Sequence, residues 1–389
     1  MNKYLLFIFI LFFISCVESY DFSSIETVEA IIIDASLTNE STAHYVKIST
    51  STSLINSAQN PVTDATVWIE DNEGAVTFFY ENEPGTYLTN SSFAGEVGKS
   101  YTLHVETKNG NQFKSSEEYL MSPTPIDSVY GEFLTLPSTE NGEISRGVQF
   151  FIDTHSNSTG DSYYRYEVEQ DYAIQVPYAS LYKWYDELGT YLFRDTLINT
   201  CYQHVPSSGV LITTTAGQTQ NVISGFPIVL VEESEPYLLT KYSLIVKQFS
   251  ISPIAYQYYK ALKKNNEASG SFFDQQKGEV LGNISGFNNT STPVLGFFEV
   301  AGVSTDKTLF NPYKWYLEGF NPERIFSKGC GYDAVADTVP KEELDSGLVD
   351  LTNRNIYYFS EDGGSAILVP KACSDCRLYG TLKKPDFWD

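Results

Sequence analysis

The chain is poor in basic residues and in the residues that most often carry catalysis. It has 389 residues, with 25 Lys and Arg against 49 Asp and Glu, and its formal net charge is −24. So acidic a surface repels a phosphate backbone, and no basic patch offsets it, which excludes nucleic acid as a partner. Histidine is also scarce, at 4 residues. These shortages argue against nucleic-acid chemistry and against a histidine-rich active site.

Motifs of common enzymes are absent as well. The chain has no His-Glu-x-x-His, no Gly-x-Ser-x-Gly and no Gly-rich phosphate loop. Carboxylate pairs could cleave glycosides, but 49 acidic residues produce such pairs by chance. The histidines stand apart in the sequence: His44, His104, His155 and His204. An acidic segment lacks the spacing of an EF-hand and is expected to be a solvated loop: Asp333, Asp337, Glu342, Glu343 and Asp345. We therefore predict a non-enzymatic protein that needs no cofactor or metal.

Only one long apolar run is present, from Tyr4 to Ile14, directly after Lys3. A membrane-spanning helix needs about 20 apolar residues, so this run is a signal peptide and not a permanent anchor. It ends in Ser15-Cys16, and Cys16 is the only cysteine in the first 200 positions. This ending resembles a lipobox, in which the cysteine is acylated and becomes the new N-terminus. The alternative is an ordinary secretory peptide in which a cysteine falls here by chance.

The lipobox predicts where the protein resides. Residues 1–15 are removed, Cys16 carries the lipid, and residues 16–25 form a polar tether. Each buried methylene adds about 0.8 kcal/mol, so several acyl chains anchor the protein firmly to a membrane. Glu18 and Asp21 lie just behind the lipid. In some Bacteroidota such early acidic residues direct export to the outer face of the outer membrane, which is the location we predict.

Beyond the tether the chain reads as short strands between turn residues, which is typical of an all-β protein. We expect strands at 28–35, 45–50, 65–69, 75–80, 85–88, 100–106 and 112–115. Together they predict an immunoglobulin-like β-sandwich over residues 26–122. Pro123 and Pro125 then interrupt the pattern, because proline cannot donate to a strand ladder. We place the domain boundary there.

Residues 126–389 predict a larger β-rich domain with one inserted helix. Strands are expected at 128–134, 147–153, 163–171, 191–198, 223–230, 239–249 and 294–301. Ser252 followed by Pro253 is a helix start, and Ile254, Tyr258 and Leu262 then recur every four residues. The helix is expected near residues 253–264, and residues 305–350 are expected to be irregular.

Four cysteines follow Cys16: Cys201, Cys330, Cys373 and Cys376. An even number outside the cytoplasm argues for two disulfides. A bond between Cys373 and Cys376 would close a very small ring, so we favour one of them pairing with Cys201 and the other with Cys330. Such bonds would pin the C-terminal tail to the second domain. The alternatives are a zinc site, which usually has two Cys-x-x-Cys pairs, and a redox motif, which needs a helix after its first cysteine.

Several motifs resemble a family of Bacteroidota lipoproteins known as domain of unknown function 4249. They are Pro61–Val67, Tyr163–Glu167, Gly270–Asp274 with Leu281–Ile284, Cys373–Gly380 and Lys384–Trp388. The resemblance implies no enzymatic activity. It implies work beside a TonB-dependent outer-membrane transporter, as an accessory or ligand-capture partner whose ligand is unknown. The alternatives are a structural or assembly subunit of another outer-membrane complex and, third, a cryptic glycan-acting enzyme.

Overall fold

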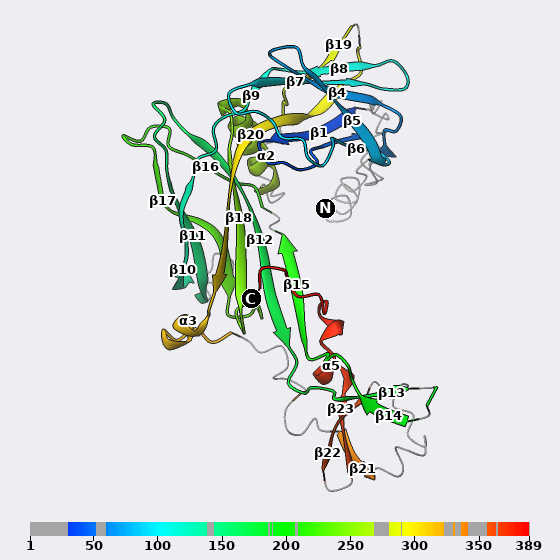
Figure 1. The fold of residues 1–389 in the computed structure, drawn as a ribbon. Coiled ribbons are helices and arrows are strands. Elements are labelled where there is room, and N and C mark those ends of the chain that lie inside the picture. The colour runs from blue at the N-terminus through cyan, green and yellow to red at the C-terminus, as the bar shows by residue number, and fades with distance from the viewer. Residues whose placement is uncertain are drawn as a thin grey trace, which may run out of the picture.

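The computed structural model has an elongated body of three parts, which we call the N-terminal lobe, the central lobe and the tip (Figure 1). It describes residues 30–51, 60–137, 144–185, 187–188, 190–206, 209–267, 280–288, 290–322, 330, 336–340, 356–362 and 365–388. Cys16, the signal peptide and the tether lie outside these residues and stay predictions. Within the described ranges, no helix has the length and apolar character needed to cross a membrane.

The N-terminal lobe is built from short antiparallel strands around one apolar core. Its strands from the first part of the chain are β1 (Ile31–Thr38), β2 (Tyr45–Thr50), β3 (Asn60–Pro61), β4 (Thr66–Asp71), β5 (Val76–Glu83), β6 (Thr86–Leu88), β7 (Ser100–Glu106), β8 (Gln112–Ser115) and β9 (Glu118–Tyr119). Alternate residues of β1 point inward: Ile31, Ile33, Ala35 and Leu37 are buried. This two-residue period is why the sequence forms strands with one face in the core.

Two strands from much later in the chain complete this lobe. β19 (Ile284–Phe287) pairs with β8, and the first half of β20 (Val294–Phe310) runs parallel to β1 from Ile31↔Val294 to Thr38↔Ala301. Phe298 lies in the same core as β1. Gly296, at φ 111°, allows the close approach, because a Cβ there would lie 1.9 Å from the Ile33 carbonyl oxygen. The N-terminal lobe therefore extends beyond the residues 26–122 expected from sequence.

The central lobe packs two sheets face to face. One contains β10 (Ile126–Pro137), β11 (Ile144–His155) and β17 (Val222–Glu232); the other contains β12 (Tyr163–Gln175), β15 (Thr200–Pro206), β16 (Leu211–Thr214), β18 (Tyr242–Ser250) and the second half of β20. The core between them joins Phe150 of β11 to Tyr166 of β12. Helix α3 (Tyr313–Leu317) closes one end with Trp315, which is fully buried and donates its indole N–H to the Gly131 carbonyl at 3.2 Å.

Helix α2 (Pro253–Glu267) confirms the predicted helix. The hydroxyl of Ser252 accepts the backbone N–H of Ala255 at 3.1 Å, as an N-cap does. The buried face differs from the expected one: Ile254 is 59% exposed, while Ala255 is buried and Tyr258 stacks on Phe297 at 4.7 Å. Ala255 and the tyrosine rings, and not Ile254, bring this helix against the sheet.

The two lobes meet where β20 passes from β1 to β18, a place we call the joint. There the guanidinium of Arg165 donates to both carboxylate oxygens of Glu299, at 2.7 and 2.9 Å, and lies 3.9 Å from the centroid of the Phe249 ring. Burial by itself lowers the pKa of Arg165, but the charge and hydrogen bonding of Glu299 together with the effects of Tyr259 and Glu167 outweigh burial, so the pKa is raised. The joint is therefore held by a buried, two-pronged ion pair.

The tip contains β13 (Tyr182–Tyr185), β14 (Thr190–Phe193), β21 (Ala336–Pro340), β22 (Ile356–Asp362), β23 (Ser365–Pro370), helix α5 (Lys371–Ser374) and the 3-10 turn η3 (Cys376–Leu378). It lies at the end of the body opposite the N-terminal lobe (Figure 1). The fold is thus mainly β, as predicted, and the immunoglobulin-like detail stays a prediction. The expectation that residues 305–350 are irregular is wrong in part, since β20 continues to Phe310 and α3 and β21 follow.

Candidate functional site

A hollow of about 710 Å³ lies between the central lobe and the C-terminal tail. It is lined by Tyr172, Ile174, Tyr202, Gln203, His204, Pro236, Leu378, Tyr379, Gly380 and Thr381. One wall is thus the edge of a sheet and the other is a segment almost 180 residues later in sequence, which the fold brings beside it. We take this hollow as the candidate site.

Strands β12 and β15 supply the sheet wall. Tyr172 lies opposite Gln203, and Ile174 lies opposite Cys201. Residues that pair directly across two strands share a face, and Tyr172 and Ile174 belong to the central core, so this face looks inward. The ring of Tyr172 stacks on Tyr237 with centroids 4.4 Å apart, which fixes its position. The amide of Gln203 is the polar group that this wall presents.

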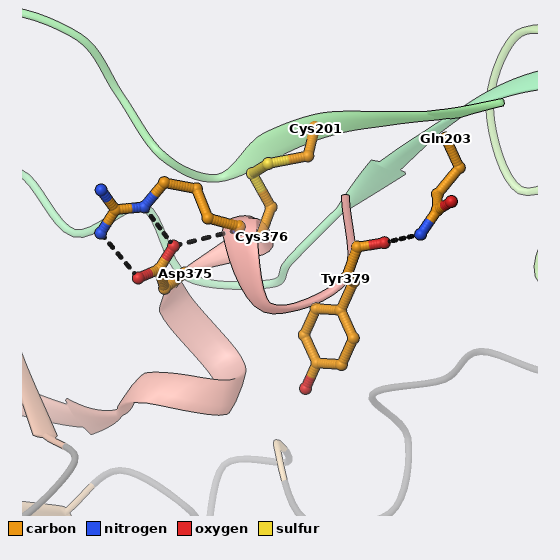
Figure 2. Close-up of a disulfide and its surroundings, with 6 residues drawn as sticks. Cys201, Gln203, Asp375, Cys376 and Tyr379 are labelled. Carbon is orange, nitrogen blue, oxygen red and sulfur yellow. Dashed lines mark hydrogen bonds and ion pairs between the residues drawn. A yellow bond between two sulfur atoms is a disulfide. The ribbon is translucent and has the colours of Figure 1, made fainter. Parts of the chain in front are cut away.

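The tail wall begins with a tight turn. The carboxylate of Asp375 accepts the backbone N–H of Arg377 at 3.0 Å and two guanidinium N–H groups of the same residue at 2.8 Å each. Figure 2 shows Asp375 in this turn directly beside Cys376, whose sulfur is bonded to that of Cys201. The local ion pair sets the turn, and the turn directs Cys376 at the strand.

The predicted disulfides are confirmed, and the structure supplies their pairing: Cys201 with Cys376 and Cys330 with Cys373. The bonds span 175 and 43 positions of sequence. All four sulfurs are used in these bonds. They are therefore not available as zinc ligands, because zinc binds thiolates. Among the described residues, no group of three or more metal-ligating side chains occurs.

The tail then continues along the edge of β15. Tyr202 and Thr381 exchange backbone hydrogen bonds at 2.8 and 3.0 Å. The amide nitrogen of Gln203 donates to the Tyr379 carbonyl, as Figure 2 shows. Gly380 is required here, because a Cβ on this residue would lie 2.7 Å from the Tyr202 carbonyl oxygen. The edge of the strand is therefore covered by the protein's own C-terminus.

The last residues reach the opposite face of the same sheet. The Trp388 ring packs edge-on against Tyr202 with centroids 5.8 Å apart and is 3% exposed. The ammonium of Lys307, on β20, lies 3.9 Å from the centroid of the Phe387 ring. Because the disulfide is on one face and Trp388 on the other, the tail clasps β15 from both sides. We call residues 376–388 the clasp.

The histidines considered from sequence are not brought together. His44 is buried against Phe93, His104 stacks on Trp68 at 5.0 Å, and His155 lies 2.7 Å from Asp127. His204 belongs to the hollow. Its Nδ1 lies 3.0 Å from a carboxylate oxygen of the buried Asp171, on the face opposite Gln203. No described hydroxyl or thiol is hydrogen-bonded to the His204 ring, so the pair lacks a nucleophile to activate.

In the part of the chain that the structure describes, the hollow is lined by no Asp, Glu, Lys or Arg. Burial, with smaller effects of Tyr237 and Glu235, raises the pKa of Tyr172 to about 12, so this phenol stays neutral at physiological pH. With an apolar wall and one amide, the site suits recognition of a neutral molecule better than proton transfer. The acidic segment considered as a calcium site lies largely outside the described residues.

Among the lining residues, the sequence singles out only His204 and those within the Cys373–Gly380 motif, and it indicates a role in ligand binding for none of them. Gln203 and Tyr172 carry no local motif, since their nearness to the tail depends on a disulfide between distant positions. The tail itself was visible as Cys373–Gly380. A pairing of Cys201 with Cys376 would have pointed to the strand around Cys201 as the opposite wall.

One protein-family model matches the chain. It is described as Domain of unknown function (DUF4249) and covers residues 17–307. The match therefore includes the N-terminal lobe and most of the central lobe, and it stops within β20 before the clasp. No curated protein matches the chain.

Proposed function

Since the chain belongs to the DUF4249 family, we infer that it is a non-enzymatic lipoprotein on the outer face of the outer membrane. In this proposal Cys16 carries the lipid, and the protein serves a TonB-dependent transporter as an accessory or ligand-capture partner. It brings no cofactor and binds no nucleic acid.

The hollow beside the clasp is the observation that supports ligand capture. Its volume of about 710 Å³ lies within the range of roughly 300–1,000 Å³ that is usual for small-molecule sites. Apolar and aromatic side chains predominate, with few polar groups, which is the usual composition of such sites. A capture protein needs this arrangement and no catalytic group.

A second candidate, a structural or assembly subunit, is favoured by the surface of the tip. Several large apolar side chains are exposed there: Leu188, Leu192, Phe193 and Leu197. Exposed apolar patches often mark protein interfaces. The same surface would also serve docking on a transporter, so the identity of the partner decides between the two candidates.

Affinity purification separates these candidates. The C-terminus is unsuitable for a tag because Trp388 is buried, whereas a Cβ on Gly110 would meet no atom within 4 Å. We therefore place the tag between Asn109 and Gly110 and extract the membranes with mild detergent. Recovery of a TonB-dependent barrel supports the first candidate, and recovery of assembly or secretion components supports the second. A protein recovered alone contradicts both.

Replacing Cys16 by Ala tests the anchor in the same cells. The variant is expected to leave the membrane fraction, and continued membrane association without a lipid would refute the proposed attachment. Turnover of a glycan by the purified protein would instead favour the glycan-acting enzyme.

A further inference from the structure

The walls of the hollow exclude ligands that carry a net charge. Among the described residues, no side chain of Asp, Glu, Lys or Arg lines it. An ion moved into such a site would lose hydration without gaining a carboxylate, ammonium or guanidinium partner. His204 is a lining residue, and its Nδ1 lies 3.0 Å from a carboxylate oxygen of Asp171 on the face of the sheet opposite Gln203. The surroundings therefore favour a neutral ligand.

The same walls disfavour a ligand that is apolar throughout. The amide nitrogen of Gln203 is engaged by the Tyr379 carbonyl, while no described group donates to its amide oxygen. Figure 2 shows this oxygen pointing away from the tail. An apolar ligand would cover it and leave it without a donor, at the cost of desolvation. A hydroxyl group on the ligand would satisfy it.

The other side chains of the lining are mainly apolar and aromatic. Tyr172 and Tyr379 supply rings, and Ile174, Pro236 and Leu378 complete the wall. Both rings are held in place: Tyr172 stacks on Tyr237, and the hydroxyl of Tyr379 donates to the Ala372 carbonyl at 3.1 Å. Rings held in this way form a preorganised surface, so little side-chain entropy is lost when a ligand packs on them. The C–H face of a pyranose ring is a suitable partner for such a surface.

We propose that this hollow binds a neutral saccharide, whose ring packs on the tyrosines and whose hydroxyl group donates to the amide oxygen of Gln203. The inference rests on the proposed role in ligand capture and names the class of ligand. It also assigns a role to the clasp, because Leu378, Tyr379 and Gly380 form one wall and the Cys201–Cys376 bond holds that wall in position.

The test uses the full-length lipoprotein in a detergent that has no sugar headgroup. Binding is measured by saturation-transfer NMR and calorimetry with four probes: maltotriose, tri-N-acetylchitotriose, chitotriose and trigalacturonate. The second and third probes share one scaffold, but only the third is cationic; the fourth is anionic. We expect at least one neutral trisaccharide to bind, and the charged probes to bind at least about tenfold more weakly.

Gln203→Leu keeps a side chain of similar size and removes both the amide oxygen and the N–H group that donates to the Tyr379 carbonyl, and it is expected to weaken binding by about tenfold. Gln220→Leu is the matched control, because Gln220 is exposed and remote from the lining residues. Circular dichroism and intact-mass analysis verify that both variants fold and keep their disulfides.

Absence of binding by both neutral probes overturns the proposal, as does equal binding of the charged probes. If Gln203→Leu binds the neutral trisaccharide as tightly as the wild type does, the assignment of the binding site to this hollow is overturned. These outcomes are independent of the affinity purification. Recovery of a transporter without saccharide binding refutes capture of this ligand class and leaves the accessory role standing.

Discussion

The joint and the clasp both hold distant parts of the chain together, but by different interactions. Each connects parts of the chain that are far apart in sequence: Arg165 meets Glu299 at the joint, and Cys201 meets Cys376 at the clasp. The joint uses hydrogen bonds and charge, whereas the clasp uses a covalent bond between two cysteines that are themselves buried. The joint should therefore respond to mutation and pH, and the clasp to thiols.

The difference follows from the core that each region can bury. The joint lies between two lobes with large apolar cores, so water is excluded and a paired charge is shielded. At the clasp, the apolar cluster around the disulfide contains only Val176, Cys201 and Cys376, with Tyr379 packed against it. Small clusters supply little hydrophobic free energy, and disulfides commonly compensate for this.

Removing the Cys201–Cys376 bond should have the largest effect. A loop of this length contributes about 5 kcal/mol in the chain-entropy model, so Cys201→Ser with Cys376→Ser should release the clasp. Hydrogen exchange at residues 378–388 should rise steeply while the joint stays protected. The control is Cys330→Ser with Cys373→Ser, whose shorter loop contributes about 4 kcal/mol. If residues 378–388 were equally protected from hydrogen exchange in wild type and in the first variant, the disulfide would not be what holds the clasp.

Arg165→Ala should be the most damaging change at the joint. It leaves Glu299, whose side chain is 2% exposed, without a counter-charge, which costs about 3–5 kcal/mol in the free energy of unfolding. Urea denaturation followed by far-UV circular dichroism measures this loss. Arg165→Met combined with Glu299→Leu should recover most of it, because no charge then remains buried. A double variant as unstable as Arg165→Ala would contradict this account.

Ser252→Ala should have a smaller effect at the joint. The Ser252 hydroxyl caps helix α2 and donates to a carboxylate oxygen of Glu118 at 2.8 Å. Loss of such a cap costs about 1 kcal/mol. The same urea titration detects it, with Ser91→Ala on the exposed surface as the control. If the two variants were equally stable, the cap would have no role.

The smallest effect concerns pH. Burial raises the pKa of Glu118, although hydrogen bonds from Ser252 and Asn283 partly oppose the shift. The folded state therefore keeps a proton to higher pH than the unfolded state, so this group reduces stability as pH rises above its ordinary pKa of 4.5. Glu118→Gln should remove that part of the pH dependence in urea titrations between mildly acidic and neutral pH. An unchanged slope would show that Glu118 does not titrate in this range.

Local patterns predicted most individual elements. The strands Tyr45–Thr50, Ser100–Glu106 and Gln112–Ser115 match the expected ranges, and Ser252-Pro253 marked the start of α2 correctly. These signals lie within a few residues, where backbone preferences and alternating burial act. The cysteine count likewise predicted two disulfides that reach back from the tail.

Long-range pairings could not be predicted in this way. The apolar run Val294–Ala301 indicates a strand but does not identify β1 as its partner, because parallel pairing leaves no turn between the two strands. For the same reason the β12–β15 wall and the tail could not be combined into a site. The hollow forms between two segments that the Cys201–Cys376 bond joins, and neither segment alone has a sequence pattern that indicates a binding site.

The late arrival of β20 has a consequence for the order of folding. In the export that we propose, the chain would emerge from its N-terminus onward, so β1 through β9 would be present long before Val294–Ala301. Until then the edge of β1 lacks its parallel neighbour, and Ile33 and Leu37 lack Phe298 and Val300, with which they share a core. Contacts so distant in sequence form slowly because their loop must close first. In that case the N-terminal lobe would be completed only after most of the central lobe had followed, and the β1 edge would stay open until then.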